Sequence, residues 1–198
     1  MKKESNKDRV IAASLGLFNQ SGTVAVTTNH IATHLHISPG NLYFHFSDRQ
    51  EIVRHLFDRM CTDTYQVWYG DGRDLILRTP EELVELVFAV FYKYRFFHRE
   101  MYHLRRIDPD LSALWKKHIK KMERLFLATY AQWVRQGWMR PLKDKHELQF
   151  ISDTILITSN SFLNFYESTS KPARNRSIKV GAEYVLRLLM PYKTTSAH

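Results

Sequence analysis

Residues 27–46 read TTNHIATHLHISPGNLYFHF, and this stretch carries the signals of two short helices joined by a turn. Thr27 or Thr28 caps the first helix, which runs through Leu35, because a threonine hydroxyl accepts backbone N–H groups at a helix start. Ser38-Pro39 opens the second helix, which ends near the close of the stretch, since serine caps well and proline is tolerated in the first turn. The stretch therefore predicts a helix, a tight turn and a second helix.

An amphipathic helix precedes this pair. Residues Asn6 to Gln20 place Ile11, Leu15 and Phe18 on one face, and Ser21-Gly22 ends the helix because glycine suits a left-handed C-cap. Three short helices in this order are typical of a helix-turn-helix unit, whose third helix enters the major groove of DNA. The sequence therefore predicts a small DNA-binding unit near its N-terminal end.

The rest of the chain also shows helical periodicity, and only 7 Gly and 6 Pro in 198 residues argue against a turn-rich all-β protein. Further helices are expected over residues 48–69, from Thr79-Pro80 to Phe97, from Asp108-Pro109 to Gln136, from His146 to Glu167 and after Lys171-Pro172. We therefore expect an all-α fold of about nine helices. Its predicted domains are a helix-turn-helix domain over residues 1–47, extending into a linking helix at 48–69, and a helical bundle over residues 70–198.

The charge balance favours anionic partners, since 29 Lys and Arg residues against 20 Asp and Glu residues give a formal net charge of +9. Most of this excess falls after residue 60, so charge alone does not point to the helix-turn-helix unit. The single cysteine, Cys61, excludes an internal disulfide and fits a reducing compartment. The longest apolar run, Leu86 to Tyr92, is far shorter than the ~18 residues that a membrane span needs. We therefore expect a cytoplasmic protein without a membrane partner.

Three neighbouring motifs resemble one known family. They are Thr27-Thr28-Asn29-His30-Ile31-Ala32, Ile37-Ser38-Pro39-Gly40-Asn41-Leu42-Tyr43-Phe44-His45-Phe46 and Asp48-Arg49-Gln50-Glu51-Ile52. Together they closely resemble the TetR/AcrR family of bacterial transcriptional repressors, over about residues 6 to 66. The stretch Tyr94-Arg95-Phe96-Phe97-His98-Arg99, followed by Asp108-Pro109, is similar to one subgroup of that family. The resemblance implies a sequence-specific regulator that binds double-stranded operator DNA and acts as a ligand-released repressor.

The resemblance also implies which side chains face DNA. The candidate DNA-binding residues are Thr27, Thr28, Asn29, Ser38, Pro39, Gly40, Asn41, Tyr43, His45 and Arg49. The amides of Asn29 and Asn41 can read an adenine edge or bind a phosphate. Tyr43 and His45 are expected at phosphates, with the Tyr43 ring against a thymine methyl group, and Arg49 is expected to hold a phosphate. The apolar residues of the same motif are expected to be mostly structural: Leu42, Phe44 and Phe46.

The C-terminal helices are expected to form a homodimer and to enclose a ligand, as the resemblance implies. The candidate pocket residues are Phe88, Phe91, Tyr92, Tyr102, His103, Trp115, His118, Met122, Phe126 and Tyr130. The candidate dimer residues are Ile155, Phe162, Ile178, Gly181, Ala182, Val185 and Leu189. An aromatic stripe at helical spacing is also typical of packed core, so this alternative stays open. An apolar wall with a few polar tips predicts a small hydrophobic or amphipathic effector.

A two-fold dimer would place its recognition helices at half-sites about one DNA turn, roughly 34–36 Å, apart. In this hypothesis, ligand binding among the C-terminal helices shifts the helix over residues 48–69 and weakens operator binding. A ligand can do so only through its different affinities for the two states.

A different class of function stays open as the alternative. His30 and His34 lie one helical turn apart with His36 close by, and such a pair can hold zinc, although no acid completes the site. The alternative is therefore a helical bundle that binds small molecules or a metal, or an enzyme, with a vestigial helix-turn-helix. No Gly-rich phosphate loop, HExxH motif or nucleophile elbow occurs in the sequence. We expect no catalytic residue, no metal site and no cofactor.

Overall fold

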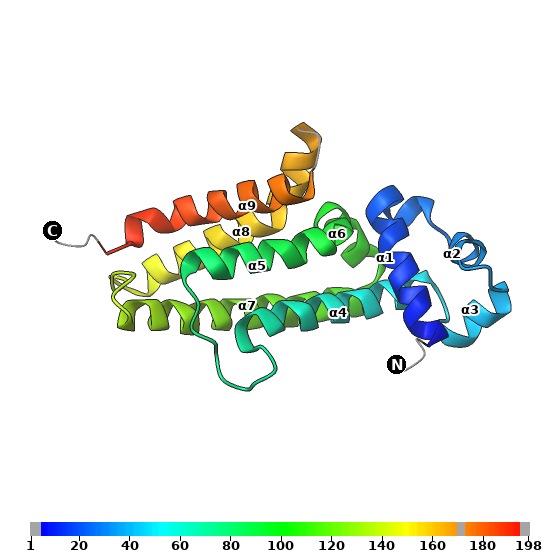
Figure 1. Ribbon diagram of the computed structural model, residues 1–198, viewed down its shortest axis with the longest axis horizontal. Helices are drawn as coiled ribbons and strands as arrows, with labels where there is room; N and C mark the ends of the chain where they lie inside the picture. Colours follow the sequence, from blue (N-terminus) through cyan, green and yellow to red (C-terminus); the bar gives the residue numbers. More distant parts are fainter. Residues whose placement is uncertain (1–4, 170–172, 195–198) are drawn as a thin grey trace. The chain divides into compact units, whose positions relative to one another are not determined.

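The computed structural model describes residues 5–169 and 173–194, and Figure 1 shows their helical course. The helices are α1 (Asn6–Ala25), α2 (Thr28–His34), α3 (Pro39–His45), α4 (Arg49–Tyr69), α5 (Pro80–Lys93), α6 (Arg95–Ile107), α7 (Pro109–Arg135), α8 (Lys145–Thr169), α9 (Arg174–Leu189) and the short 3-10 helix η1 (Met190–Tyr192). Within the described ranges, the only β-type pairing is an isolated bridge between Met139 and Lys193. The predicted all-α fold of about nine helices is confirmed. The predicted break at Lys171-Pro172 lies outside the described residues.

The chain divides into two compact units. Unit 1 consists of Met1–Thr62 and Tyr94–Ala113, and unit 2 consists of Asp63–Lys93 and Leu114–His198. Helix α4 therefore begins in unit 1 and ends in unit 2 as one continuous helix. This division differs from the predicted domains at 1–47 and 70–198, because α6 packs against α1.

Side-chain caps fix the helix-turn-helix of unit 1. The Thr27 hydroxyl accepts the backbone N–H of His30 at 3.2 Å and begins α2, and the Ser38 hydroxyl accepts the N–H of Asn41 at 3.2 Å and begins α3. Both predicted caps are confirmed. In the turn between the two helices, His36 has a φ of 55°, which is a left-handed conformation that favours glycine.

Polar contacts tie α6 to the C-terminal part of α1 within unit 1. Gly22 adopts a φ of 78° and kinks α1, and the next N–H, that of Thr23, donates to the Glu100 carboxylate at 3.1 Å. The Arg99 guanidinium donates to the carbonyl of Asn19 at 2.8 Å, and the Asn19 side-chain carbonyl accepts the N–H of Phe96 at 3.2 Å. These bonds explain why α6 belongs with the helix-turn-helix helices.

An ion pair ties α4 to the turn between α6 and α7 in the same unit. Arg54 donates to Asp108 at 2.7 Å, and the other carboxylate oxygen of Asp108 accepts the N–H of Leu111 at the start of α7. Asp108 is buried, so its carboxylate needs these partners. The Asp108-Pro109 motif of the sequence is therefore both a helix start and an anchor for α4.

The sequence predicts one helix from Pro80 to Phe97, but the structure has two. Helix α5 ends at Lys93 and α6 begins at Arg95, because Tyr94 leaves the helical conformation at φ −110° and ψ 35°. The apolar run continues across this break, so periodicity alone does not reveal it.

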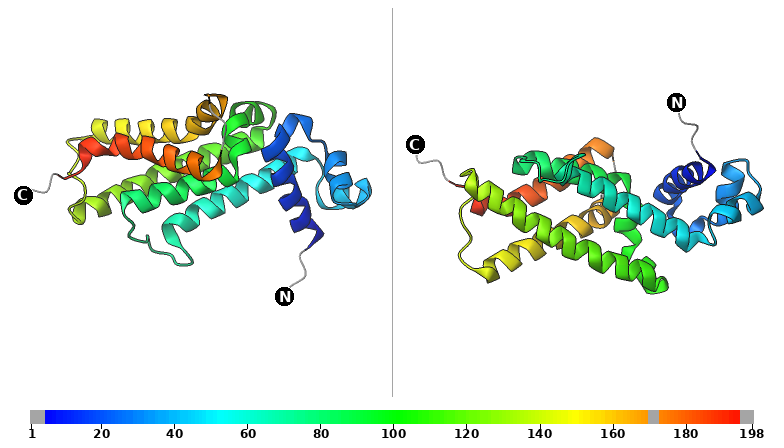
Figure 2. Two further views of the ribbon diagram at one scale, coloured as in Figure 1. Left: turned by 45° about the horizontal axis from the view of Figure 1, so that its top comes forward. Right: turned by 90° about the horizontal axis from the view of Figure 1, so that it is seen from below.

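In unit 2, α9 packs against both α5 and α8, and the views of Figures 1 and 2 agree that these helices run side by side. Gly181 makes the contact between α9 and α5 close. A Cβ atom at this position would lie 2.3 Å from the Phe88 ring and 2.8 Å from the Phe162 ring. Trp133 and Phe88 are among the largest side chains buried in this unit.

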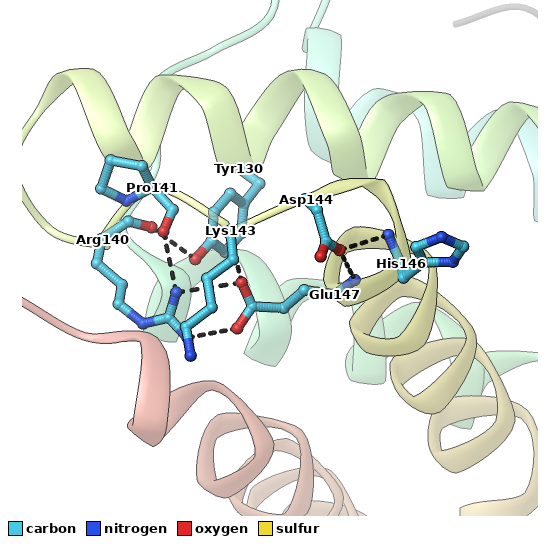
Figure 3. A network of polar contacts seen from close by, with 7 residues as sticks. All are labelled: Tyr130, Arg140, Pro141, Lys143, Asp144, His146 and Glu147. Atoms are coloured by element: carbon cyan, nitrogen blue, oxygen red, sulfur yellow. Dashed lines mark hydrogen bonds and ion pairs between the residues drawn. The ribbon is translucent and has the colours of Figure 1, made fainter.

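A polar network closes the loop between α7 and α8 at one end of unit 2 (Figure 3). Both oxygens of the Glu147 carboxylate accept bonds from the Arg140 guanidinium, at 2.5 and 3.2 Å, and the backbone N–H of Lys143 donates at 2.5 Å. The hydrogen bonds from Arg140 and Lys143 lower the pKa of Glu147 to about 2. Asp144 caps α8 by accepting the N–H groups of His146 and Glu147. Two contacts from other segments also hold the loop, since the Arg140 N–H donates to the carbonyl of Tyr192 at 2.8 Å and the Tyr130 hydroxyl donates to the carbonyl of Arg140 at 3.0 Å.

Candidate nucleic-acid interface and ligand cavity

The predicted DNA-contacting residues gather on α2, on α3 and at the start of α4. Thr27, Asn29, Ser38, Pro39, Gly40, Asn41 and Tyr43 are exposed, and Thr28, His45 and Arg49 are half-buried. Leu42 points the opposite way and is fully buried, which fixes the rotation of α3 about its axis. One face of the recognition helix is thus anchored in the core while its polar side chains stay accessible.

A hydrogen bond joins the two helices at this surface. The Thr28 and Tyr43 hydroxyls lie 3.0 Å apart, so one of them donates to the other. They border an open depression of about 250 Å³, which is lined by Thr27, Thr28, Tyr43, Ser47, Asp48, Arg49 and Gln50. Hydroxyl groups on its wall are suited to bind the phosphate oxygens of a DNA backbone.

Arg49, for which the resemblance predicts a phosphate contact, makes hydrogen bonds within unit 1. Its Nη1 donates to the carbonyl of Thr23 at 2.5 Å and approaches the carbonyl of Val26 at 3.5 Å. Thr23 lies in the last turn of α1 and Val26 in the link to α2, so Arg49 fixes the start of α4 against the corner between these helices. The geometry therefore favours Arg49 as a positioning residue.

The start of α4 also holds two carboxylates beside the depression. Asp48 accepts the N–H of Glu51 at 2.7 Å, and Glu51 accepts the N–H and hydroxyl of Ser47 at 2.7 and 2.9 Å. The backbone and hydroxyl bonds from Ser47 lower the pKa of Glu51. Both acids therefore act as helix caps.

Phe44 is not the structural residue that the sequence predicts. Its side chain is 84% exposed on α3, whereas Leu42 and Phe46 are buried as predicted. Its ring makes an edge contact with the neighbouring His45, with 5.1 Å between ring centroids. The position two residues after Leu42 lies about 200° around the helix, which places Phe44 on the outer face.

His30 of α2 is used for capping. His30 Nδ1 lies 3.1 Å from the carbonyl of Ala25 and 3.4 Å from the N–H of Thr27, which completes the N-terminal capping box. Within residues 5–169 and 173–194, no three His, Cys, Asp or Glu side chains gather as metal ligands would. His30 thus has a structural use in the helix-turn-helix.

Unit 2 contains a cavity of about 70 Å³ among α4, α5, α7, α8 and α9. Its lining residues are Trp68, Leu83, Val84, Val87, Phe88, Phe91, Met122, Phe126, Trp133, Ser152, Ile155, Leu156, Ser159, Val185 and Leu189. Ser152 and Ser159 provide the only hydroxyl groups in this lining, and none of its side chains is charged. The wall therefore suits an apolar, uncharged molecule.

The cavity includes some of the predicted pocket residues and leaves out others. Phe88, Phe91, Met122 and Phe126 line it, whereas Tyr92, Tyr102, His103, Trp115, His118 and Tyr130 do not. Tyr102 is 70% exposed on α6 and so faces away from any core. The buried His118 instead lies 3.0 Å from the Tyr65 hydroxyl, and the Tyr130 hydroxyl donates to the carbonyl of Arg140. These residues share an aromatic character but lie on different helix faces.

Sequence reasoning missed Ser152, Ser159, Trp68 and Trp133 as cavity residues. Ser152 is 1% exposed, and its hydroxyl has no hydrogen-bond partner among the residues that the structure describes. A buried hydroxyl without a partner is costly and is suited to bind a ligand atom. The spacing of Ser152 and Ser159, seven residues apart in an apolar helix, was the available signal because it puts both on one face.

The predicted dimer residues pack against other residues of the same chain. Gly181, Ala182, Val185 and Leu189 are buried on α9, Phe162 is buried on α8, and Ile155 lines the cavity. Ile178 is half-buried and packs against the same core. Within unit 2, α9 uses these small and apolar residues to pack on α5 and α8.

A capped helix-turn-helix whose third helix keeps its polar side chains accessible is the arrangement of a helical DNA-binding protein. Two family models match the chain: one described as bacterial regulatory proteins, tetR family, over residues 10–56, and one described as bacterial transcriptional repressor, over residues 70–198. The chain therefore belongs to the TetR family, as its motifs suggested, and it is a DNA-binding transcriptional regulator.

Solved structures share this fold. A TetR-family transcriptional regulator from Marinobacter aquaeolei VT8 is 29% identical, with 96% of this chain and 92% of that chain covered and a TM-score of 0.85. A ketosteroid transcriptional regulator of Mycobacterium tuberculosis is 19% identical, with 98% of both chains covered and a TM-score of 0.63. The regulator AibR, solved in complex with isovaleryl coenzyme A and operator DNA, is 11% identical, with 91% and 98% covered and a TM-score of 0.62.

None of the helices in the described part of the chain combines the length and the apolar character of a membrane span.

Proposed function

We propose that this protein is a homodimeric repressor that a small, uncharged apolar effector releases from its operator. The observation that carries the proposal is the apolar cavity of unit 2, in a chain whose other unit presents a recognition helix. TetR-family proteins are regulators, and we assign this chain no catalytic role.

We assign DNA contact to the accessible groups of α2 and α3. The amides of Asn29 and Asn41 are exposed and can read a base edge, and the Thr28 and Tyr43 hydroxyls border the depression suited to a phosphate. The test is fluorescence anisotropy with duplex DNA selected in vitro from a random pool, repeated over a salt series. The Asn41→Ala/Tyr43→Ala double variant should lose sequence-dependent binding. Equal binding of selected and scrambled DNA by the wild-type protein would overturn the assignment.

The effector assignment follows from the charge and size of the cavity. A carboxylate or phosphate inside it would find no charged partner, and burying an unpaired ion costs several kcal/mol. The cavity of about 70 Å³ is about half of the ~150 Å³ that holds a benzene molecule, so a larger effector must displace lining side chains. The isovaleryl group bound to AibR is an apolar acyl chain of the kind that this wall would accept.

Methyl hexanoate and hexanoate are matched probes for this assignment, since they differ in charge at one end. Trp68 and Trp133 line the cavity, so their fluorescence should report binding. We expect the ester to bind at least about 100-fold more tightly than the acid. Ser152→Ala should weaken binding of the ester by about 2- to 10-fold, because one hydrogen bond to the ester is lost. Ser177→Ala is the matched control, since that buried serine also lacks a described partner but lies outside the cavity lining.

The dimer assignment rests on apolar side chains that unit 2 leaves uncovered. Phe150, Ile157 and Phe165 on α8 and Tyr184 on α9 are each more than half exposed. The seven- and eight-residue spacings on α8 put its three residues within one broad face, and α8 and α9 pack together. An isologous contact with a second copy would cover this surface.

Light scattering tests the dimer directly. The wild-type protein should have twice the chain mass of 23.5 kDa, and Ile157→Glu should shift it to one chain mass. Val24→Glu is the control, because Val24 is equally exposed but lies on α1 of unit 1. A dimer that Ile157→Glu leaves intact would place the interface elsewhere.

The proposed release uses the continuity of α4. Trp68 near its C-terminal end lines the cavity, and Arg49 at its N-terminal end is bonded to the corner between α1 and α2. An effector that displaces the lining would shift α4 and, through Arg49, that corner. Different affinities of the effector for the two arrangements then set how far operator binding falls.

A further inference from the structure

Phe44 presents a large apolar ring on the outer face of the recognition helix. Its side chain is 84% exposed, the largest exposed fraction of any large apolar side chain in the described residues. Gly40 lies one turn earlier on the same face, and nothing but the Ser38 hydroxyl, at 4.0 Å, would meet a Cβ atom there. The outer face of α3 therefore offers a bare backbone followed by one aromatic ring.

The residues next to Phe44 make contacts within the fold, whereas most of the Phe44 ring is exposed. The Tyr43 hydroxyl is bonded to Thr28, and Leu42 is buried in the core. The edge contact with His45 covers little of the Phe44 ring and helps to fix its direction. An exposed aromatic ring on the helix that enters the major groove is available to contact the edge of a base.

The dimensions of α3 allow this ring to reach a base. The major groove, about 12 Å wide, admits an α-helix such as α3, whose diameter with side chains is about 10–12 Å. Among the groups that base pairs present in that groove, the 5-methyl group of thymine is the apolar one. A phenylalanine ring can contact that methyl group but cannot donate a hydrogen bond to any base.

We propose that Phe44 determines operator specificity by packing against the 5-methyl group of a thymine. The proposal rests on the assignment of α3 as the DNA-reading helix and adds a base preference to it. It also moves the predicted thymine contact from Tyr43 to Phe44. Phe44 is thus a specificity-determining residue, and the amides and hydroxyls around it supply the polar contacts.

Replacing single thymines by deoxyuridine tests the proposal, since uracil pairs as thymine does and lacks only the methyl group. The duplex is one selected from a random pool with the wild-type full-length protein, and affinity is measured by anisotropy. Burial of one methyl group is worth about a fourfold change in affinity, so replacement at the contacted position should weaken binding about fourfold. Replacement at the other positions should have a smaller effect.

Two variants then assign the methyl contact to a residue. Phe44→Ala should bind the thymine and deoxyuridine duplexes equally well, because the group that senses the methyl is gone. Tyr43→Phe should keep the fourfold preference, because it removes only a hydroxyl. Unchanged thermal unfolding of Phe44→Ala is expected from the exposure of this side chain.

The outcomes separate this inference from the assignment on which it rests. A wild-type protein that is indifferent to every deoxyuridine substitution in its selected duplex would overturn the inference alone. So would a Phe44→Ala variant that keeps the full preference for thymine. Selection that enriches no duplex would overturn the inference together with the DNA-binding assignment.

Discussion

In unit 1, the segment from Thr23 to Val26 is held by charged groups on both sides: Glu100 accepts its N–H and Arg49 donates to its carbonyls. In unit 2, the cavity is lined almost entirely by hydrocarbon and contains no charged side chain. Directional bonds fix the corner between α1 and α2 in one geometry, whereas apolar contacts allow side chains to shift with a small energy cost each. The geometry of the corner in unit 1 is thus fixed by directional bonds, whereas the cavity lining in unit 2 can rearrange, as the proposed binding of an effector requires.

The largest difference should appear on removal of one phenylalanine from each unit. Phe88 is buried in unit 2, with its ring centroid 5.7 Å from those of Phe91 and Phe162, so Phe88→Ala should lower the free energy of unfolding by about 3–5 kcal/mol. Phe44→Ala in unit 1 should change it by less than about 0.5 kcal/mol, because that ring is exposed. Urea unfolding measures the free energy of unfolding of both variants. Similar decreases for Phe88→Ala and Phe44→Ala would contradict the expected difference between the two positions.

Acid should destabilise unit 2 through a buried histidine. Burial lowers the pKa of His118 to about 4, below its ordinary value of 6.5, so the folded chain binds this proton less readily than the unfolded chain does. The free energy of unfolding therefore keeps its full value above about pH 6.5 and decreases as the pH falls toward 4, because the unfolded chain gains a proton at this histidine that the folded chain does not. Between pH 7 and pH 5, this group should cost about 2 kcal/mol of unfolding free energy.

Denaturant titrations of His118→Gln at both pH values isolate that contribution. Between pH 7 and pH 5, the unfolding free energy of the variant should fall by about 2 kcal/mol less than that of the wild-type protein. His103→Gln is the control, because His103 is exposed on α6. Equal pH dependence in the wild-type and His118→Gln proteins would show that His118 is accessible to protons in the folded state.

The polar corner of unit 1 predicts how Arg49 affects DNA binding. Arg49→Gln should weaken operator binding about tenfold by loosening the start of α4, while the slope of affinity against salt stays that of the wild-type protein. Loss of a phosphate contact would instead reduce that slope by about 1. Anisotropy over a salt series distinguishes the two roles. Arg73→Gln, the same charge change in unit 2, should leave both quantities unchanged.

The smallest effect concerns the turn of the helix-turn-helix. His36 holds a left-handed φ of 55°, which costs a residue with a Cβ atom about 1 kcal/mol or more, so His36→Gly should raise the melting temperature by about 2–4 °C. His34→Gly is the matched control, since the same substitution within α2 should lower it. A lower melting temperature for both variants would show that the turn carries no such strain.

Local signals made the helix-turn-helix predictable. Thr27, Ser38 and Pro39 act through the residues next to them, and the structure shows both caps. The orientation of Phe44 was also available in principle, since it follows from the burial of Leu42 two residues earlier. Chemical type alone led to the expectation that all three apolar residues of the motif are structural.

Long-range contacts explain what the sequence could not reveal. A glycine such as Gly181 indicates a close helix contact without naming the partner, which proved to be Phe88 of the same chain. The placement of α6 with unit 1 depends on Glu100 and Arg99, which meet residues nearly eighty positions away. Aromatic spacing likewise could not separate cavity residues such as Phe126 from exposed ones such as Tyr102.

The most direct test of the account is the operator affinity of the wild-type protein measured while methyl hexanoate is added. The account predicts that the affinity falls as the fluorescence of Trp68 and Trp133 reports occupancy of the cavity, and that hexanoate at equal concentration has little effect. By linkage, operator DNA must weaken ester binding by the same factor. Saturation of the fluorescence change with an unaltered operator affinity would contradict the account.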